Sequence, residues 1–275
     1  MTVDHKQVDI NQIIAIAKAA GHAIMQIYQT KDFSIEHKAD HSPLTAADMA
    51  AHHVIETGLQ AVSNLPILSE ESALIPYETR KHWQDYWLVD PLDGTREFIK
   101  RNGEFTVNIA LISQHQPVLG VVYAPDKALL YYAQKGQSAY KQLGIEPPFN
   151  IATKPFNKDH ISIAASRSHA DSRLVEFIAE LAQKNQQAPE LVTLGSSLKI
   201  CLVAEGMADV YPRFGPTSEW DTAAAQCVLE CSGGALNSLD DIPFSYNNKI
   251  SLLNASFFAH SGEHNWSQYL ENVSE

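Results

Sequence analysis

Two aspartates lie three positions apart at the end of an apolar run in this chain. The run Trp-Leu-Val at 87–89 leads into the segment Asp-Pro-Leu-Asp-Gly-Thr at 90–95. A residue before proline is restricted to extended backbone geometry, so Asp90 is expected to close a strand over residues 86–90. Pro91 suits the second position of a type I turn, whose end residues, here Asp90 and Asp93, lie less than about 7 Å apart.

Two carboxylates held this close repel each other unless one is protonated or a cation lies between them. Hard cations such as Mg²⁺ take carboxylate and carbonyl oxygens, so the Leu92 carbonyl is a plausible further ligand. Gly94 allows close backbone approach to an incoming group, and Thr95 places a hydroxyl beside it. The segment therefore indicates a metal site, with an ordinary Asp-Gly turn as the structural alternative.

Acidic residues also stand at the ends of two other predicted elements. Glu70 follows a short apolar strand predicted over 65–69, and Asp221 opens a helix predicted over 221–231. Each has a structural explanation alone: a solvated acid for Glu70, and a favourable interaction with a helix N-terminus for Asp221. Together with Asp90 and Asp93, they favour one convergent acidic site.

The elements that must position these acids follow from hydrophobic periodicity. Apolar residues at steps of three and four predict helices over 10–28 and 45–60, the second capped by Thr45. Short strands are predicted over 33–36, 65–69, 86–90, 106–113, 118–124 and 128–133, the last four as an antiparallel meander. After a Pro-Pro pair at 147–148, strands at 161–165, 191–194 and 208–211 alternate with helices at 172–184, 196–205 and 221–231. This order predicts a layered α/β fold (α+β in its first half) with two subdomains, residues 1–155 and 156–275.

Composition limits the partners and the location. The chain of 275 residues is 45% hydrophobic and carries a net charge of −12, which argues against a nucleic-acid partner. The N-terminal stretch lacks a signal-like apolar segment, and the apolar stretches are too broken for stable membrane insertion. We expect a cytoplasmic protein; loose association with the cytoplasmic face of the inner membrane and the choice between monomer and homodimer remain open. The three cysteines are expected to be buried thiols.

These motifs resemble a known family. Residues 90–95, with Glu70-Glu71-Ser72 upstream and Trp220-Asp221 downstream, resemble the inositol monophosphatase superfamily of Mg²⁺-dependent, lithium-sensitive phosphatases. Segments 96–99, 166–169, 195–199 and 211–217 are similar to CysQ-type 3'(2'),5'-bisphosphate nucleotidases. The resemblance implies a sandwich of alternating helix and sheet layers, shared with fructose bisphosphatases. It also implies hydrolysis of adenosine 3',5'-bisphosphate to AMP and phosphate, in sulfur metabolism, and extends to its sulfated relative; an inositol or sugar phosphatase is the alternative.

The resemblance also implies roles for individual residues. Glu70, Asp90 and the Leu92 carbonyl would bind one Mg²⁺, and Asp90, Asp93 and Asp221 a second; a third, weakly held ion is compatible with it. Thr95 would pair with Asp48, and with Glu70 these form the implied catalytic set. The implied substrate contacts are Glu70, Leu92, Asp93, Gly94, Thr95, Ser166, Arg167, Gly195, Ser196, Lys199 and Asp221. Four acids and two Mg²⁺ sum to zero charge, which suits a phosphate dianion. Asp48 also fits a capping box opened by Thr45.

Several alternatives remain at this point. The basic residues that could neutralise a second phosphate, or simply be solvated, are Arg96, Lys100, Arg101, Arg167, Lys199 and Arg213. Haloacid-dehalogenase-type phosphatases also end a strand in Asp-x-Asp-Gly-Thr, but their aspartates are one residue closer, which here favours attack by water over an aspartyl-phosphate. A catalytically silent metal-binding protein is the alternative outside enzymes. His52 and His53 fit no catalytic motif and receive no role.

Overall fold

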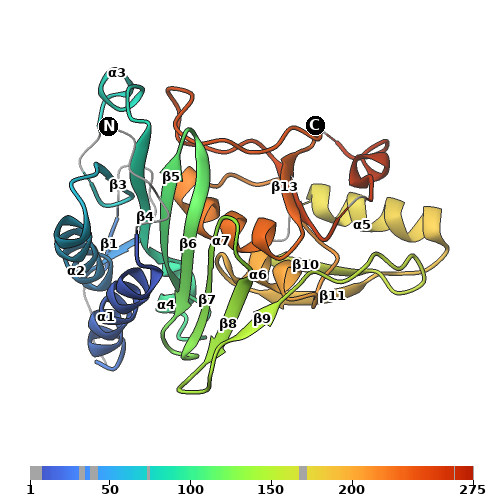
Figure 1. Ribbon diagram of the computed structural model, residues 1–275. Coiled ribbons are helices and arrows are strands. Elements are labelled where there is room, and N and C mark those ends of the chain that lie inside the picture. Colours follow the sequence, from blue (N-terminus) through green and yellow to red (C-terminus); the bar gives the residue numbers. More distant parts are fainter. Residues whose placement is uncertain are drawn as a thin grey trace.

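Helices and sheets alternate in layers across the protein in the computed structural model (Figure 1). The structure describes residues 8–30, 35–37, 43–72, 75–166, 172–262 and 264–274. Two helices cover a seven-stranded sheet, two more lie between this sheet and a five-stranded sheet, and a fifth long helix covers the outer face of the second sheet. The layered helix-and-sheet sandwich expected from the sequence is therefore confirmed.

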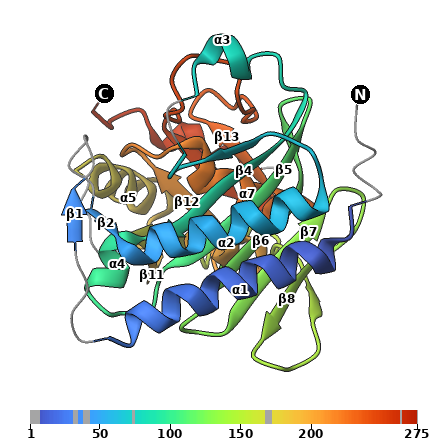
Figure 2. The same ribbon diagram turned by 90° about the vertical axis from the view of Figure 1, so that its left-hand side faces the viewer.

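The first layer consists of α1 (Ile10–Tyr28) and α2 (Ala46–Val62). They lie side by side across the seven-stranded sheet (Figure 2). Asp9 accepts the backbone N–H of Asn11 at 2.9 Å and so caps α1. The buried face of α1, including Ile13, Ala17 and Ile24, packs with residues of α2, β4, β5 and β6 in one apolar cluster. The predicted amphipathic helix has the bounds that its periodicity indicated.

The seven-stranded sheet has the order β3-β4-β5-β6-β7-β8-β9. Its strands are β3 (Ile67–Ser69), β4 (Asp85–Asp93), β5 (Thr106–Ser113), β6 (Gln116–Ala124), β7 (Leu129–Gln134), β8 (Ala139–Leu143) and β9 (Phe149–Ile151). Strand β3 is parallel to β4, and every other neighbouring pair is antiparallel. The predicted meander is confirmed, and β8 and β9 extend it beyond the strands that the sequence indicated.

Two helices fill the space between the sheets, α6 (Leu198–Ala204) and α7 (Glu219–Cys231). Helix α7 packs on β5, β6 and β7, and α6 packs on α7 and on strands of the second sheet. Gly120 of β6 makes this approach close, because a Cβ there would lie 2.2 Å from the Ala224 carbonyl oxygen. The predicted helix over 196–205 begins two residues later, because Ser196 has a positive φ of 49°.

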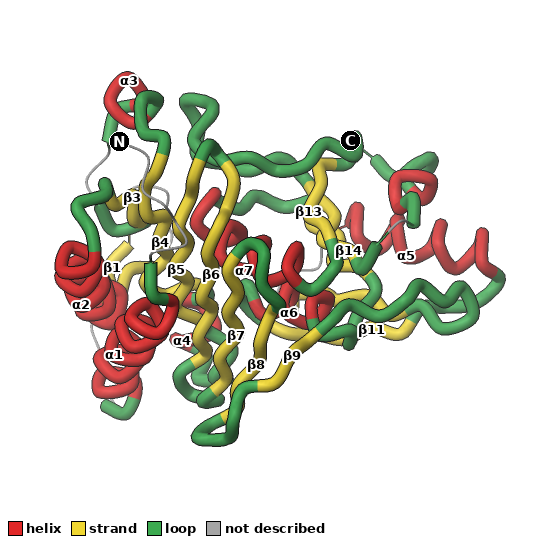
Figure 3. The backbone as a smooth tube through the Cα atoms, viewed as in Figure 1, coloured by secondary structure: helices red, strands yellow, loops and turns green. Residues whose placement is uncertain are grey.

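The second sheet has the order β11-β10-β12-β14-β13. Its strands are β10 (Ser162–Ser166), β11 (Glu190–Leu194), β12 (Val210–Arg213), β13 (Ala235–Ser238) and β14 (Phe257–His260). Helix α5 (Ser172–Asn185) and the 3₁₀ helix η2 (Trp266–Tyr269) pack together as the outer layer. The tube view separates the two sheets and the helices between them (Figure 3).

Smaller elements complete the fold. Strands β1 (Ile35–His37) and β2 (Pro43–Thr45) form a two-stranded sheet, and α3 (Tyr77–Arg80) and α4 (Thr95–Ile99) are short helices. Most of the strand predicted over 33–36, and the side chain of the predicted cap Thr45, lie outside the described residues. All three cysteines are free thiols, with Cys201 and Cys227 buried.

The predicted division near residue 155 lies between β9 and β10 and hence between the two sheets. One apolar cluster nevertheless joins residues of both halves, since Leu88 and Val122 of the first sheet share it with Val228 and Phe257. We therefore propose the two subdomains only as a description of sheet membership. None of the described helices is long and apolar enough to cross a membrane.

Candidate active site

A bulge in β4 brings two of the predicted acidic ligands to the same side of the sheet. Asp90 pairs with Asn108 of β5 and Asp93 pairs with Thr106, so three residues of β4 span two of β5. Alternate residues of a strand share a face, so this extra residue turns Asp93 to the face of Asp90. The prediction that the strand ends at Asp90 and that a type I turn follows was wrong, because β4 continues to Asp93. The expected closeness of the two carboxylates holds.

Three carboxylates converge at this bulge. One oxygen from each of Asp90, Asp93 and Asp221 lies within 4.8 Å of the others. Burial raises the pKa of Asp90 well above its usual range, and the charges of Glu70, Asp93 and Asp221 raise it further. The pKa values of Asp93 and Asp221 are also raised, in both cases chiefly by burial. Clustered buried carboxylates of this kind favour a bound cation over three bare charges.

Glu70 joins the cluster from the neighbouring strand. It follows β3, and its backbone N–H donates to the Val89 carbonyl at 3.1 Å, next to Asp90. Glu70 and Asp90 share a side-chain hydrogen bond that helps to raise the pKa of Asp90, and the charge of Glu70 raises the pKa of Asp221. A hydrogen bond between two carboxyl groups requires a proton in place of a cation. The donor set of four carboxylates therefore fits hard divalent ions such as Mg²⁺.

Asp221 reaches the cluster from the first turn of α7. Its Oδ2 accepts the Ser218 backbone N–H at 2.8 Å, which stabilises the start of the helix. A carboxylate has a second oxygen, so this capping bond and metal binding are compatible. The helix-terminus explanation and the metal-ligand explanation for Asp221 thus apply together.

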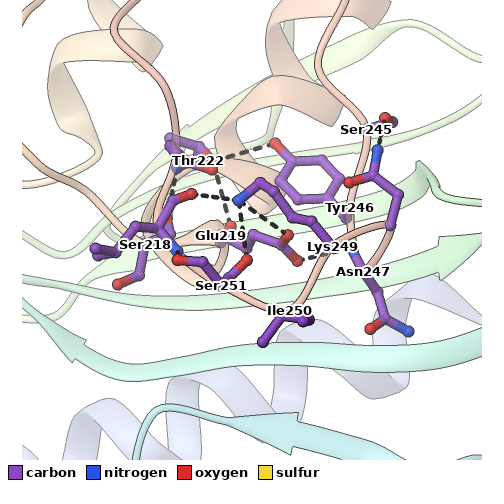
Figure 4. Close-up of polar contacts among 12 residues, drawn as sticks. Ser218, Glu219, Thr222, Ser245, Tyr246, Asn247, Lys249, Ile250 and Ser251 are labelled. Carbon is purple, nitrogen blue, oxygen red and sulfur yellow. Dashed lines mark hydrogen bonds and ion pairs between the residues drawn. The ribbon is translucent and has the colours of Figure 1, made fainter. Parts of the chain in front are cut away.

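A buried polar network holds this end of α7 in place (Figure 4). Glu219 Oε2 accepts the Asn247 backbone N–H at 2.8 Å, and the ammonium of Lys249 lies 3.9 Å from Glu219 Oε1. The Asn247 side chain exchanges two bonds of 2.6 Å with Arg80, which also donates to the Ile250 carbonyl. Arg80 ends α3, so the network ties the N-terminal half of the chain to the helix that carries Asp221.

Thr95 and Asp48 lie together at the edge of the cluster. The Thr95 hydroxyl is 3.4 Å from Asp48 Oδ1 and 3.4 Å from the Leu92 carbonyl oxygen. Asp48 is buried in the first turn of α2, behind Thr95. The Leu92 N–H donates to Asp90 Oδ1 at 3.0 Å, which fixes the bulge. The predicted Thr95–Asp48 pair is thus present as a contact between α2 and α4.

The segment before α6 contacts the same acids. Asp93 Oδ2 accepts the Ser197 backbone N–H at 2.5 Å, and Ser197 Oγ donates to Asn108 Oδ1 at 2.9 Å. Ser196 lines the cleft beside them, and its buried hydroxyl has no hydrogen-bond partner among the described residues. An unpaired buried hydroxyl costs free energy until a ligand or water bonds to it. Ser196 is therefore well placed to contact a bound molecule.

Lys199 supplies a buried cation. Its side chain is 5% exposed, its ammonium donates to the Ser196 carbonyl at 2.6 Å, and it lies 5.3 Å from the centre of the Tyr211 ring. Burial lowers the pKa of Lys199 to about 8, although the nearby charge of Asp93 opposes this shift. Lys199 is therefore protonated at neutral pH and can attract an anion.

The cleft around these groups has a volume of about 780 Å³. Of the predicted site residues, those that line it are Glu70, Asp90, Leu92, Asp93, Gly94, Thr95, Ser166, Ser196, Lys199 and Asp221. Gly94 has a φ of 87°, which explains the glycine. Gly195 does not line the cleft; its N–H donates to Glu104 Oε2 at 2.9 Å. Arg167 lies outside the described residues.

The other basic candidates separate into two groups. Arg96 and Arg213 line the cleft, and Arg213 is held by the Gly215 and Pro216 carbonyls at 3.1 and 3.0 Å. Arg101 instead donates to the Tyr28 and Thr30 carbonyls and ties α1 to the loop after α4. Ser197 and Tyr211 also line the cleft, although the sequence analysis gave them no individual role. Their positions beside Asp93 and Lys199 depend on tertiary contacts.

Comparison with known proteins agrees with this site. The model of the inositol monophosphatase family matches residues 5–272, and the chain belongs to this family. The 3'(2'),5'-bisphosphate nucleotidase CysQ of Escherichia coli strain K12 is 47% identical over 252 residues, covering 90% of this chain and 98% of its own length. CysQ of Haemophilus influenzae is 38% identical over 251 residues, covering 90% and 91%. The family resemblance inferred from the motifs is therefore confirmed.

Solved structures show the same fold. CysQ from Bacteroides thetaiotaomicron superposes with a TM-score of 0.83 and 42% identity, covering 94% of this chain and 99% of its own. An inositol monophosphatase from Anabaena superposes with a TM-score of 0.73 and 24% identity, covering 96% and 95%. The second likeness shows only a shared fold, so substrate assignment depends on the site and on the nearer relatives.

Proposed function

We propose that this protein is a Mg²⁺-dependent 3'(2'),5'-bisphosphate nucleotidase that hydrolyses the 3'-phosphate of adenosine 3',5'-bisphosphate to give AMP and phosphate. The observation that carries the proposal is the convergence of Asp90, Asp93 and Asp221 within 4.8 Å, with Glu70 beside them, in a cleft that also contains Lys199. Relatives at 47% identity that are named for this activity support the substrate class.

Glu70, Asp90, Asp93, Asp221 and the Leu92 carbonyl would hold the metal. Their formal charge of −4 matches two Mg²⁺ ions, and the number of ions is part of the proposal. When bound, Mg²⁺ would lower the pKa of the attacking water and stabilise charge on the phosphate oxygens. The protein's net charge of −12 would otherwise repel a bisphosphate.

Thr95 and Asp48 would move the proton of the attacking water. With its own proton directed at Asp48, 3.4 Å away, the Thr95 oxygen presents a lone pair to a water in the cleft. As the water attacks phosphorus, its proton passes to Thr95 while the Thr95 proton passes to Asp48. Contacts of this kind are often long without substrate and shorten in the reacting complex.

The remaining cleft residues would bind the substrate. The cations of Lys199 and Arg213 and the unpaired hydroxyl of Ser196 are suited to phosphate oxygens. Ser166, at the end of β10, lies in the same cleft and begins the segment whose sequence resembles the nucleotidases. A second phosphate distinguishes this substrate from inositol 1-phosphate, and extra cations are the feature that would recognise it.

The test is a comparison of kcat/KM for adenosine 3',5'-bisphosphate, its sulfated relative, inositol 1-phosphate and fructose 1,6-bisphosphate, each with saturating Mg²⁺. We expect the adenosine bisphosphate to be preferred by at least about 100-fold over inositol 1-phosphate, which corresponds to about 2.7 kcal/mol of transition-state binding. A preference for inositol 1-phosphate or the sugar would contradict the proposed substrate class. Loss of activity with chelator and its return with Mg²⁺ would separate metal dependence from substrate choice.

A further inference from the structure

We propose that His52, His53 and Glu56 of α2 form a second metal site, outside the phosphatase cleft, that binds a zinc-class divalent cation. One ligand atom from each of the three side chains lies within 4.8 Å of the others. His52 Nε2 is 3.9 Å from Glu56 Oε2, and the two imidazole centroids are 5.6 Å apart. His52 and Glu56 are one helical turn apart and share a face, with His53 beside them.

The donor atoms set this site apart from the cleft. Two imidazole nitrogens and one carboxylate oxygen form a set that zinc accepts, with a fourth position open to water. Mg²⁺ instead prefers an octahedron of oxygens, which the carboxylates of Asp90, Asp93 and Asp221 can supply. Imidazole ligands favour zinc, copper and nickel over magnesium. The two clusters would therefore select different ions.

A second contact orients the first ligand. The ring of His52 is 6% exposed, and its Nδ1 lies 3.0 Å from Ser69 Oγ. A metal on Nε2 requires the proton of the neutral ring on Nδ1, which would then donate to Ser69. Hydrogen bonds of this kind commonly fix the orientation of metal-binding histidines. One ligand is thus held in place before the ion arrives.

The other two ligands provide access and adjustment. His53 is exposed, and the side chain of Glu56 is 43% exposed, so an ion can enter from solvent. Small rotations of these side chains would shorten the present separations to the zinc–ligand distances of about 2.0–2.2 Å. Ser69 precedes Glu70 and also accepts the Glu71 N–H at 3.3 Å, so a bound ion would fasten α2 to the segment that carries Glu70.

The test measures Zn²⁺ binding by equilibrium dialysis of the whole protein in excess Mg²⁺, which occupies oxygen ligands. We expect the wild type to bind one more Zn²⁺ per chain than His53→Gln, with affinity at this site reduced at least about 10-fold in the variant. His82→Gln, which removes another exposed histidine, is the matched control and should bind as the wild type does. Equal binding by the wild type and His53→Gln would overturn the site.

Zinc-edge X-ray absorption provides an independent readout. Imidazole scattering is expected from the wild type and should weaken in His53→Gln, whereas a purely oxygen environment would contradict the proposal. Zn²⁺ should also raise the Tm of the wild type and of His82→Gln more than that of His53→Gln. Mg²⁺-dependent phosphate release should be unchanged in His53→Gln, so failure of this site and failure of the phosphatase assignment give different results.

Discussion

The carboxylate of Asp93 accepts the backbone N–H of Ser197 at 2.5 Å, which joins the bulge of β4 to the loop before α6. The same Asp93 lies in the three-carboxylate cluster, and Ser197 follows Ser196 in the cleft. One side chain therefore connects the proposed metal ligands to the proposed substrate loop. This connection explains why two segments so far apart in the sequence can act on one phosphate.

Asp93→Asn should reduce Mg²⁺-dependent turnover while preserving the fold. The amide oxygen can still accept the Ser197 N–H, but a charged ligand is lost from the cluster. Because metal ions contribute several kcal/mol of transition-state stabilisation, we expect kcat/KM to fall by at least about 100-fold. Rates measured against Mg²⁺ concentration, with thermal unfolding as the fold control, check this; a rate within a factor of about two of wild type would show that Asp93 is not a ligand.

Thr95→Val should impair the chemical step more than binding. The variant keeps the shape of the side chain and removes the hydroxyl that contacts Asp48 at 3.4 Å. We expect kcat to fall by about 10²–10⁴-fold, the usual contribution of general acid–base catalysis, with KM little changed. Thr95→Ser, which restores a hydroxyl, should recover most of the activity. If the valine variant keeps full kcat, the proton path through Thr95 and Asp48 is wrong.

Substrate binding should weaken as pH rises through about 8. Burial lowers the pKa of Lys199 to about 8, so the amine is charged below this pH and neutral above it. A phosphate dianion loses its partner as the amine deprotonates, and KM should therefore increase on the alkaline side. Lys199→Gln should have a raised KM at pH 7 and a flatter pH profile between 7 and 9. Parallel profiles for the two proteins would remove Lys199 from substrate binding.

Glu219 should make folding stability depend on pH. Burial raises its pKa to about 7, above the unfolded value of about 4.3. Its contribution to stability is therefore fully present below the unfolded pKa and is lost as pH rises through 7. Glu219→Gln keeps an oxygen for the Asn247 N–H and cannot ionise. The Tm of wild type minus that of the variant, measured with saturating Mg²⁺, should decrease from pH 5 to pH 8; a constant difference would contradict a buried, titrating Glu219.

Local sequence patterns predicted the elements whose burial repeats along the chain. The three- and four-residue spacing from Ile10 to Tyr28 gave α1 its observed bounds, because a helix with one buried face leaves that period in the sequence. Strands β8, β13 and β14 left no such pattern. In β14, all four residues from Phe257 to His260 are buried, so the alternation that marks a half-exposed strand is absent.

The site was only partly predictable for a different reason. Asp90, Asp93 and Asp221 were identifiable by residue type, but their convergence came from a family resemblance and not from local rules. The bulge that turns Asp93 toward Asp90 depends on pairing with Asn108 and Thr106, which the β4 sequence does not contain. Ser197 had no distinguishing signal, since its role arises from a hydrogen bond across the fold.

The most direct test of the account is anomalous diffraction from crystals soaked with Mn²⁺, which takes the place of Mg²⁺ among oxygen ligands. The account predicts anomalous peaks among the carboxylates of Asp90, Asp93 and Asp221, with Glu70 and the Leu92 carbonyl oxygen also in contact. Bound AMP should lie in the same cleft, near Ser196 and Lys199. Crystals that contain Mn²⁺ elsewhere but show no peak among these oxygens would contradict the proposed metal centre.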